Sequence, residues 1–237
     1  MAWFLLIIFC GAATLNAEQL SKEAELNCER ARGYYHQGLN FKKENNLEAA
    51  MQAFSTAIES CPTYEQVYRD RGLARYELKD YRGAIADFTK AISLISQELD
   101  VLYHYRGASY LGNGNYAEAV ADYDRAIRMR AFPHGLYYLN RAGAHEGLKN
   151  YTKALEDYAR GLKIDPSDSY FHRRALLNLK LEKYREALKD YDDAIAMVEG
   201  HRELQKKFEC TSIVSSYKID LNQLAIYYLN RGIIKAK

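Results

Sequence analysis

The chain has 237 residues, of which 48% are hydrophobic, so it is long enough to bury a continuous core as one elongated domain. Its 33 basic and 31 acidic residues are mixed along the sequence and leave a net charge of +2. This balance argues against nucleic-acid binding, which requires a basic patch or stripe. With 3 prolines in total, the chain has no Pro-rich linker.

The amino-terminal segment carries no charged side chain before Glu18. The apolar run from Ala2 to Leu15 is typical of a signal-peptide core, and Leu15-Asn16-Ala17 fits the pattern of a cleavage site before Glu18. A run of about 14 residues is short for a membrane span. Three alternatives stay open: a cleaved signal, an uncleaved membrane anchor, and a lipid-modified Cys10, which the bulky residue before it disfavours. We expect export, to a periplasm or the outside, with any membrane association confined to this segment.

From residue 31 onward, one pattern recurs five times at intervals of about 34 residues. In the clearest copies, a tyrosine, an arginine and a small residue come first; after a polar turn follow an alanine, an aspartate, an aromatic residue and a second alanine. This period is typical of a solenoid, in which each helix pair buries its apolar face against its neighbours. One copy contains Tyr68, Arg71, Gly72, Tyr81, Ala84, Asp87, Phe88 and Ala91, and the next contains Tyr103, Arg106, Gly107, Tyr116, Ala119, Asp122, Tyr123 and Ala126.

These columns resemble the tetratricopeptide repeat, a unit of two antiparallel helices. The resemblance implies an all-α fold, a right-handed α-solenoid of helix-turn-helix repeats. It covers roughly 31–201 and again 225–237. The expected segments are a signal peptide at 1–17, a capping helix at 18–30, repeats at 31–64, 65–99, 100–134, 135–167 and 168–201, an irregular insertion at 202–224, and a partial sixth repeat or carboxy-terminal cap at 225–237.

The two ends of the array need covers, because a terminal repeat has one unburied face. Residues 18–30 are rich in Glu, Ala and Leu and are expected to form a helix over the first repeat. At the other end, Ile233 and Ile234 are apolar for a solvent-facing helix. Self-association through this end is therefore one alternative.

Charged residues also repeat. Arginine occupies the seventh place of most copies, and aspartate occupies one place on the second helix. The first copy lacks both, with Gln37 and Ala53 instead, which indicates that the two residues pair. The pattern does not decide whether partners share a repeat or belong to successive ones, and a row of arginines that binds anions is the alternative. The residues are Arg71, Arg106, Arg141, Arg174 and Arg231, and Asp87, Asp122, Asp157 and Asp190.

If the chain is exported, its cysteines can form disulfides, because these bonds persist in oxidising compartments. Cys28 lies before the first helix of the first repeat, and Cys61 lies at the end of its second helix. Antiparallel helices bring these ends together, so a Cys28–Cys61 disulfide is geometrically reasonable; two unrelated thiols are the alternative. Cys210 is then free or paired with another chain.

The resemblance also implies a binding surface. In the family, the second, fifth, ninth and twelfth places of each first helix line a concave groove, and we call these the groove places. The groove of this chain is expected to suit an extended or helical peptide with apolar anchors. The candidate partner-binding residues are Arg32, Tyr35, Lys42, Arg69, Tyr76, His104, Leu111, Leu139, Glu146 and His172. The chaperone-binding members grip a peptide carboxylate with Lys, Asn and Arg at fixed places, and this chain lacks that clamp.

No catalytic or metal-binding constellation is recognisable. The six histidines have no His-Glu-x-x-His spacing, and the chain has no phosphate loop or nucleophile elbow. We therefore predict no enzymatic activity, no cofactor and no metal. The predicted function is that of an exported adaptor that binds a protein or peptide partner. The alternatives are a secreted effector acting on a host protein and a protein that self-assembles through its carboxy-terminal end.

Overall fold

The computed structural model describes residues 2–95, 99–207 and 221–235. Every element in these ranges is an α-helix, which confirms the all-α prediction. The helices are α1 (Ala2–Lys43), α2 (Leu47–Ser60), α3 (Glu65–Glu77), α4 (Tyr81–Leu94), α5 (Leu99–Gly112), α6 (Tyr116–Met129), α7 (Gly135–Gly147), α8 (Tyr151–Ile164), α9 (Asp168–Lys180), α10 (Tyr184–Lys207) and α11 (Leu221–Lys235).

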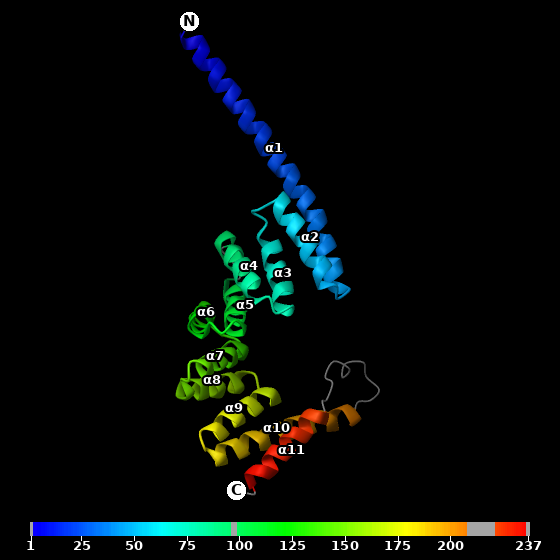
Figure 1. Cartoon of the computed structure of the whole chain (residues 1–237), viewed down its shortest axis with the longest axis vertical. Helices are drawn as coiled ribbons and strands as arrows, with labels where there is room; N and C mark the ends of the chain where they lie inside the picture. The colour runs from blue at the N-terminus through cyan, green and yellow to red at the C-terminus, as the bar shows by residue number, and fades with distance from the viewer. Residues whose placement is uncertain (1, 96–98, 208–220, 236–237) are drawn as a thin grey trace. The chain divides into compact units, whose positions relative to one another are not determined.

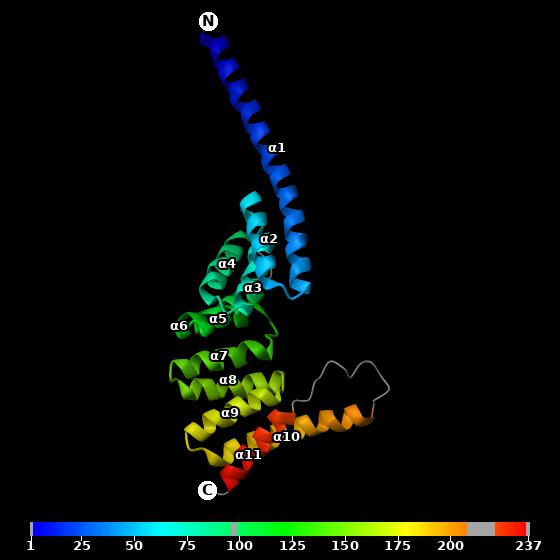
Figure 2. The same cartoon turned by 45° about the vertical axis from the view of Figure 1, so that its right-hand side comes forward.

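The helices pack in sequential pairs, α1 on α2, α3 on α4, α7 on α8 and α9 on α10. Figures 1 and 2 show the members of each pair running antiparallel. The chain divides into two compact units, the first ending at Asp122 and the second beginning at Tyr123. Each unit is described by itself below.

The turns inside the pairs share one backbone conformation. The fifteenth residue of every full repeat has a positive φ, between 58° at Glu182 and 82° at Gly114. In this left-handed conformation the next residue can donate its N–H back into the first helix, as Asp80 does to the carbonyl of Arg75 at 2.8 Å. The side chain of Asp80 then caps the second helix by accepting from the N–H of Gly83 at 3.0 Å. The polar turn between α3 and α4 therefore ends the first helix and caps the second.

The core consists of the repeated small and aromatic columns. The second helices bury an alanine and an aromatic ring in each repeat, and all ten side chains are fully inaccessible to solvent. The rings lie against the small residue in the eighth place: a Cβ on Gly38 would come within 2.4 Å of Phe54, and one on Gly72 within 3.0 Å of Phe88. The core residues are Ala50, Ala84, Ala119, Ala154 and Ala187, with Phe54, Phe88, Tyr123, Tyr158 and Tyr191.

Two boundaries differ from those expected. Residues 18–30 do not form a separate cap: they belong to α1, which continues past the end of α2, and residues 19–26 are exposed (Figure 1). The reason is local, because this stretch contains good helix formers and no proline to end the helix. Within the insertion expected at 202–224, the helix expected at its start is the continuation of α10 to Lys207, and α11 begins at Leu221, before the expected end of the insertion.

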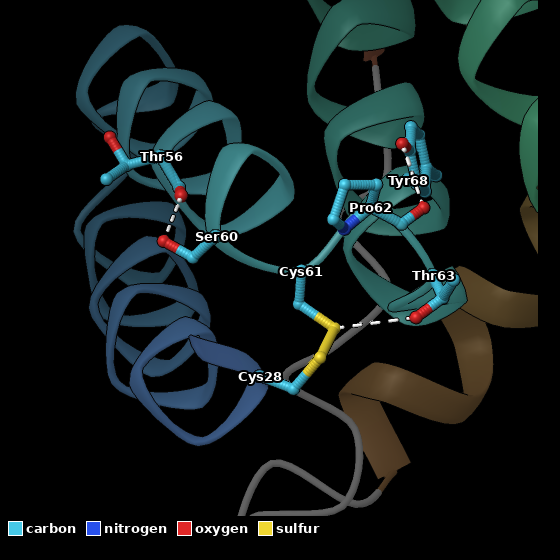
Figure 3. Close-up of a disulfide and its surroundings, with 7 residues drawn as sticks. All are labelled: Cys28, Thr56, Ser60, Cys61, Pro62, Thr63 and Tyr68. Carbon is cyan, nitrogen blue, oxygen red and sulfur yellow. Dashed lines mark hydrogen bonds between the residues drawn. A yellow bond between two sulfur atoms is a disulfide. The ribbon is translucent and has the colours of Figure 1, made fainter. Parts of the chain in front are cut away.

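A disulfide joins Cys28 of α1 to Cys61 at the end of α2 (Figure 3). The Cα atoms lie 4.7 Å apart, and Cys61 is buried with 4% of its surface exposed. The Thr63 hydroxyl lies 3.6 Å from the Cys61 sulfur, and the Tyr68 hydroxyl donates to the carbonyl of Pro62 at 3.2 Å. The bridge and these contacts fix the connection from the first repeat into α3. Cys210 lies outside the described residues.

Candidate functional site

The repeated arginines pair with the repeated aspartates of their own repeat. In the second repeat, Nε and Nη2 of Arg71 donate to the two carboxylate oxygens of Asp87, at 3.0 and 2.7 Å. Arg106 and Asp122 show the same bidentate geometry, and so do Arg141 and Asp157. Arg174 and Asp190 complete the set. The sequence left open whether the partners share a repeat or belong to successive repeats, and the structure shows that they share a repeat.

The remaining guanidinium nitrogen, Nη1, reaches the preceding repeat. Arg71 donates to the Ser55 hydroxyl at 3.0 Å, and Arg106 donates to the Thr89 hydroxyl at 3.2 Å. Arg141 binds Asp124 in the same way. These acceptors stand two places after the aspartate column, and sequence reasoning missed them because the column mixes Ser, Thr and Asp and holds Ala159 in the fourth repeat. Each of these arginines thus ties one repeat to its predecessor.

Electrostatics agree with a structural role for the arginines. The hydrogen bond and charge of Asp122 raise the pKa of Arg106 above its ordinary value. Burial lowers the pKa of Arg141, but hydrogen bonds and charges from Asp157 and Asp124 outweigh it and give a net rise. These arginines are held charged with their donors directed at protein oxygens, so they are not available as an anion-binding row.

In the first unit, the predicted groove residues differ in accessibility. Arg32 is exposed, and Lys42 is half-buried 3.6 Å from Glu77. Arg69 is half-buried and contacts Asp70. Tyr76 stacks edge-on against Tyr81, and Leu111 is half-buried. Arg32, Lys42, Arg69, Tyr76 and Leu111 therefore keep surface for a partner.

Two other groove residues of this unit are engaged by the protein. Tyr35 is 8% exposed, and its hydroxyl donates to Asp70 at 2.6 Å. Burial and this hydrogen bond raise the pKa of the Tyr35 hydroxyl. His104 is also 8% exposed and lies edge-on to Tyr105. Tyr35 thus joins α1 to α3 through Asp70, and both side chains are largely withdrawn from the surface.

The second unit needs one correction to the predicted groove. Leu139 is 1% exposed and belongs to the core, because it fills the space above Gly161, where a Cβ would approach its Cγ to 2.5 Å. Leu139 is therefore removed from the groove set. Glu146 is half-buried and accepts a hydrogen bond from the Tyr158 hydroxyl. His172 is half-buried between Tyr191 and Tyr227, with ring centroids at 5.6 and 5.2 Å.

Large apolar side chains nevertheless remain exposed at groove places of the second unit. Leu176 of α9 is 47% exposed, and on α11 the exposed fractions are 42% for Ile226, 63% for Leu229 and 52% for Ile233. Leu136 of α7 is 41% exposed. The α11 residues were absent from the predicted set, although apolar residues at the second, fifth and ninth places of the partial repeat were the available signal. Ile234, by contrast, is buried in the core.

The first unit has a small pocket at its own groove places. Gln66 and Arg69 of α3 and Val101 of α5 line it, together with Leu102 and residues at the end of α4. Its volume is about 20 Å³, enough for roughly one water molecule. Within the described ranges, no cluster of three or more His, Cys, Asp or Glu side chains is arranged to hold a metal ion. Nor does any helix in those ranges have the length and apolarity needed to cross a membrane.

Comparison with known proteins decides the family. Residues 31–64 and 106–169 each match the tetratricopeptide repeat family. The chain is a tetratricopeptide repeat protein. Both the expected family and the expected fold class are thus confirmed, and the eighth-place glycines and bidentate Arg–Asp pairs are features of this protein's repeats.

Solved structures share the fold at low sequence identity. MamA from Desulfovibrio magneticus RS-1 superposes with a TM-score of 0.64 at 17% identity, covering 75% of this chain and 96% of that chain. YrrB, described as a tetratricopeptide repeat protein with an unusual peptide-binding site, gives 0.60 at 21% identity, covering 79% and 96%. Pseudomonas aeruginosa pilF gives 0.60 at 19% identity, covering 89% and 94%. A search of curated proteins returned no significant match.

Proposed function

We propose that this tetratricopeptide repeat protein is a non-enzymatic adaptor that binds a segment of a partner protein at its groove places. The observation that carries the proposal is the exposure of Leu136, Leu176, Ile226, Leu229 and Ile233 in the second unit. These side chains stand at corresponding places of the first helices α7, α9 and α11, and exposed apolar surface of this kind is typical of an interaction site.

The chemistry of the ligand follows from the side chains around this surface. Leu176 and Leu229 are aliphatic and exposed, and His172 lies between two aromatic rings. These side chains favour apolar anchors, so the ligand in the second unit is a peptide with aliphatic or aromatic side chains. In the first unit, Arg32 and Arg69 give the groove places a basic character instead.

The family supports a binding role, because tetratricopeptide repeats are protein-interaction modules and offer an extended surface in place of an enclosed active site. The description of YrrB as having a peptide-binding site is consistent with this role.

We also propose that the adaptor works outside the cytoplasm. The uncharged, apolar start of the chain supports export through a signal peptide, with an uncleaved membrane anchor as the alternative. The Cys28–Cys61 disulfide supports the same location, since disulfides persist in oxidising compartments.

The groove can be tested with peptides selected from a random display library on the full chain. Leu176→Glu and Ile233→Glu are expected to weaken binding of the selected peptides by about tenfold or more in fluorescence anisotropy, because each variant places a charge against an apolar anchor. Ile164→Glu is the matched control, since Ile164 is 48% exposed in the same unit but lies on a second helix. If Leu176→Glu and Ile233→Glu bind the peptides as tightly as Ile164→Glu does, the binding site lies away from the groove places.

A further inference from the structure

The turn between α6 and α7 exposes a phenylalanine to solvent. Phe132 is 91% exposed, whereas the other exposed large apolar side chains of the described residues are exposed by 63% or less. Met129, the last residue of α6, is 49% exposed. Pro133 disfavours a helical conformation at Phe132, so the helix does not continue through the turn. Two large apolar side chains are thus left in solvent within four residues of each other.

The same segment is basic. Arg125, Arg128 and Arg130 are exposed, and residues 125–136 include no aspartate or glutamate. Arg125 and Arg128 are three residues apart, and Met129 follows Arg125 by four, so these side chains share one face of α6. Positive charges therefore stand beside the exposed apolar side chains.

Two carboxylates border this segment, and both have partners in the structure. Asp124 binds Nη1 of Arg141, which balances its charge. Asp165 accepts a hydrogen bond from the N–H of Gly135 at 2.6 Å. The three arginines outnumber Asp165, so the surface around the turn is positive.

Contacts within the turn hold its backbone on both sides of Phe132. Nη1 of Arg130 lies 3.2 Å from Nε2 of His134. The His134 ring lies edge-on to Tyr137, with the centroids 5.5 Å apart, and its carbonyl accepts from the N–H of Tyr137 at 3.0 Å. A turn that is already ordered loses less conformational entropy when its exposed side chain binds.

These surroundings fit a lipid bilayer better than a protein partner. The ring of Phe132 has almost no protein atoms beside it, since 91% of the residue is exposed. An aromatic anchor of a protein interface lies in a well-packed pocket of complementary shape, with other contacts around it that exclude water. A bilayer accepts an apolar side chain without such complementarity, and its anionic headgroups attract basic residues.

We propose that Met129 and Phe132 enter the interface of an anionic bilayer while Arg125, Arg128 and Arg130 bind its phosphate headgroups. This lipid-binding surface belongs to a second helix and the turn after it, so it is separate from the groove places and goes beyond the peptide-binding function. The sequence confined the expected membrane association to the amino-terminal segment, because a sequence pattern does not show how exposed Phe132 is.

A tryptophan at position 132 would report this contact directly, because the chain has one tryptophan, Trp3, which can be replaced. The full chain with Trp3→Phe and Phe132→Trp is mixed with vesicles of phosphatidylcholine, with or without phosphatidylglycerol. On the anionic vesicles alone, we expect a blue shift of the emission and quenching by lipids brominated in the acyl chains. Salt at about 0.5 M should reverse both effects, because it screens the arginines. Attachment through the amino-terminal segment alone does not place the ring among the acyl chains.

Charge variants of this reporter test the arginines. Arg125→Gln with Arg128→Gln should weaken binding to the anionic vesicles about tenfold or more, since each basic residue near such a surface adds to the attraction. Lys153→Gln with Lys183→Gln is the matched control, because it removes two exposed charges from the same unit and should leave binding unchanged. Circular dichroism checks that each variant is folded.

A second reporter tests the place of contact. Leu176→Trp with Trp3→Phe puts the only tryptophan at a groove place that is 47% exposed, and we expect no quenching there. Equal quenching of both reporters, or none at position 132 on either kind of vesicle, would overturn the proposal. So would an equal blue shift at position 132 with soluble polyglutamate, by making an acidic polypeptide the occupant. These outcomes leave peptide binding at the groove places to its own test.

Discussion

Arg71, Arg106 and Arg141 each combine a buried ion pair within their repeat with a hydrogen bond or ion pair to the preceding repeat. Arg141 donates to both oxygens of Asp157, whose side chain is 3% exposed, and also binds Asp124 on α6. A buried carboxylate depends on such a partner, since its desolvation is costly when the partner is removed.

Replacing Arg141 with methionine should therefore lower the free energy of unfolding by about 3–5 kcal/mol, because it leaves Asp157 buried and without its bidentate partner. Urea unfolding followed by circular dichroism would measure the change. Arg160→Met, at a side chain that is 59% exposed, is the control and should change stability by no more than about 0.5 kcal/mol. A loss as small as that of the control would contradict the structural role of Arg141.

His172 should make the stability depend on pH. Burial, and then the charge of Arg173, lower the pKa of His172 below 6.5, while Asp168 opposes them. The unfolded chain therefore binds the proton first, and stability falls as pH drops below about 6.5 toward the folded-state pKa. His145 shifts in the same direction, again chiefly through burial. His172→Phe should reduce the loss of stability between about pH 7 and pH 5 in urea titrations, and an unchanged loss would refute this assignment.

At the scale of elements, the disulfide joins the two helices of the first repeat across 33 residues of sequence. Reduction should lower the stability of this repeat by about 2–4 kcal/mol, because it releases a closed loop in the unfolded chain. Thermal melts with and without a phosphine reductant would measure the effect. The Cys28→Ser/Cys61→Ser variant lacks the bridge, so it should melt at the lower temperature with and without the reductant. A reductant effect that persists in this variant would point to another cysteine.

The helix pairs were predictable where the same residue type stands at the same place in every repeat. The alanine and aromatic columns specify the helix pairs, since both are fully buried in every repeat. The Arg–Asp columns predict pairing but not its partner, because one-dimensional spacing does not separate a contact within a repeat from one to the next. The assignment of Leu139 to the groove was wrong because its burial depends on Gly161, a residue on the opposite helix, and a place within one helix does not show this contact. The prediction divided α1 into a cap and a first helix, although no residue between these two segments ends a helix.

For the whole molecule, the proposals of export and of partner binding are linked, because a partner must be in the compartment to which the apolar amino-terminal segment would direct the chain. A fusion of residues 1–30 to alkaline phosphatase, an enzyme active only after export, should be active in a bacterial host. Leu6→Arg with Ile8→Arg should abolish this activity, since charges interrupt the apolar run that a signal peptide needs. Amino-terminal sequencing of the full chain recovered from outside the cytoplasm should begin at Glu18 if the signal is cleaved after Ala17. An intact amino terminus in the membrane fraction would favour an anchor, and an inactive fusion would remove the support for export while leaving the groove proposal to its own test.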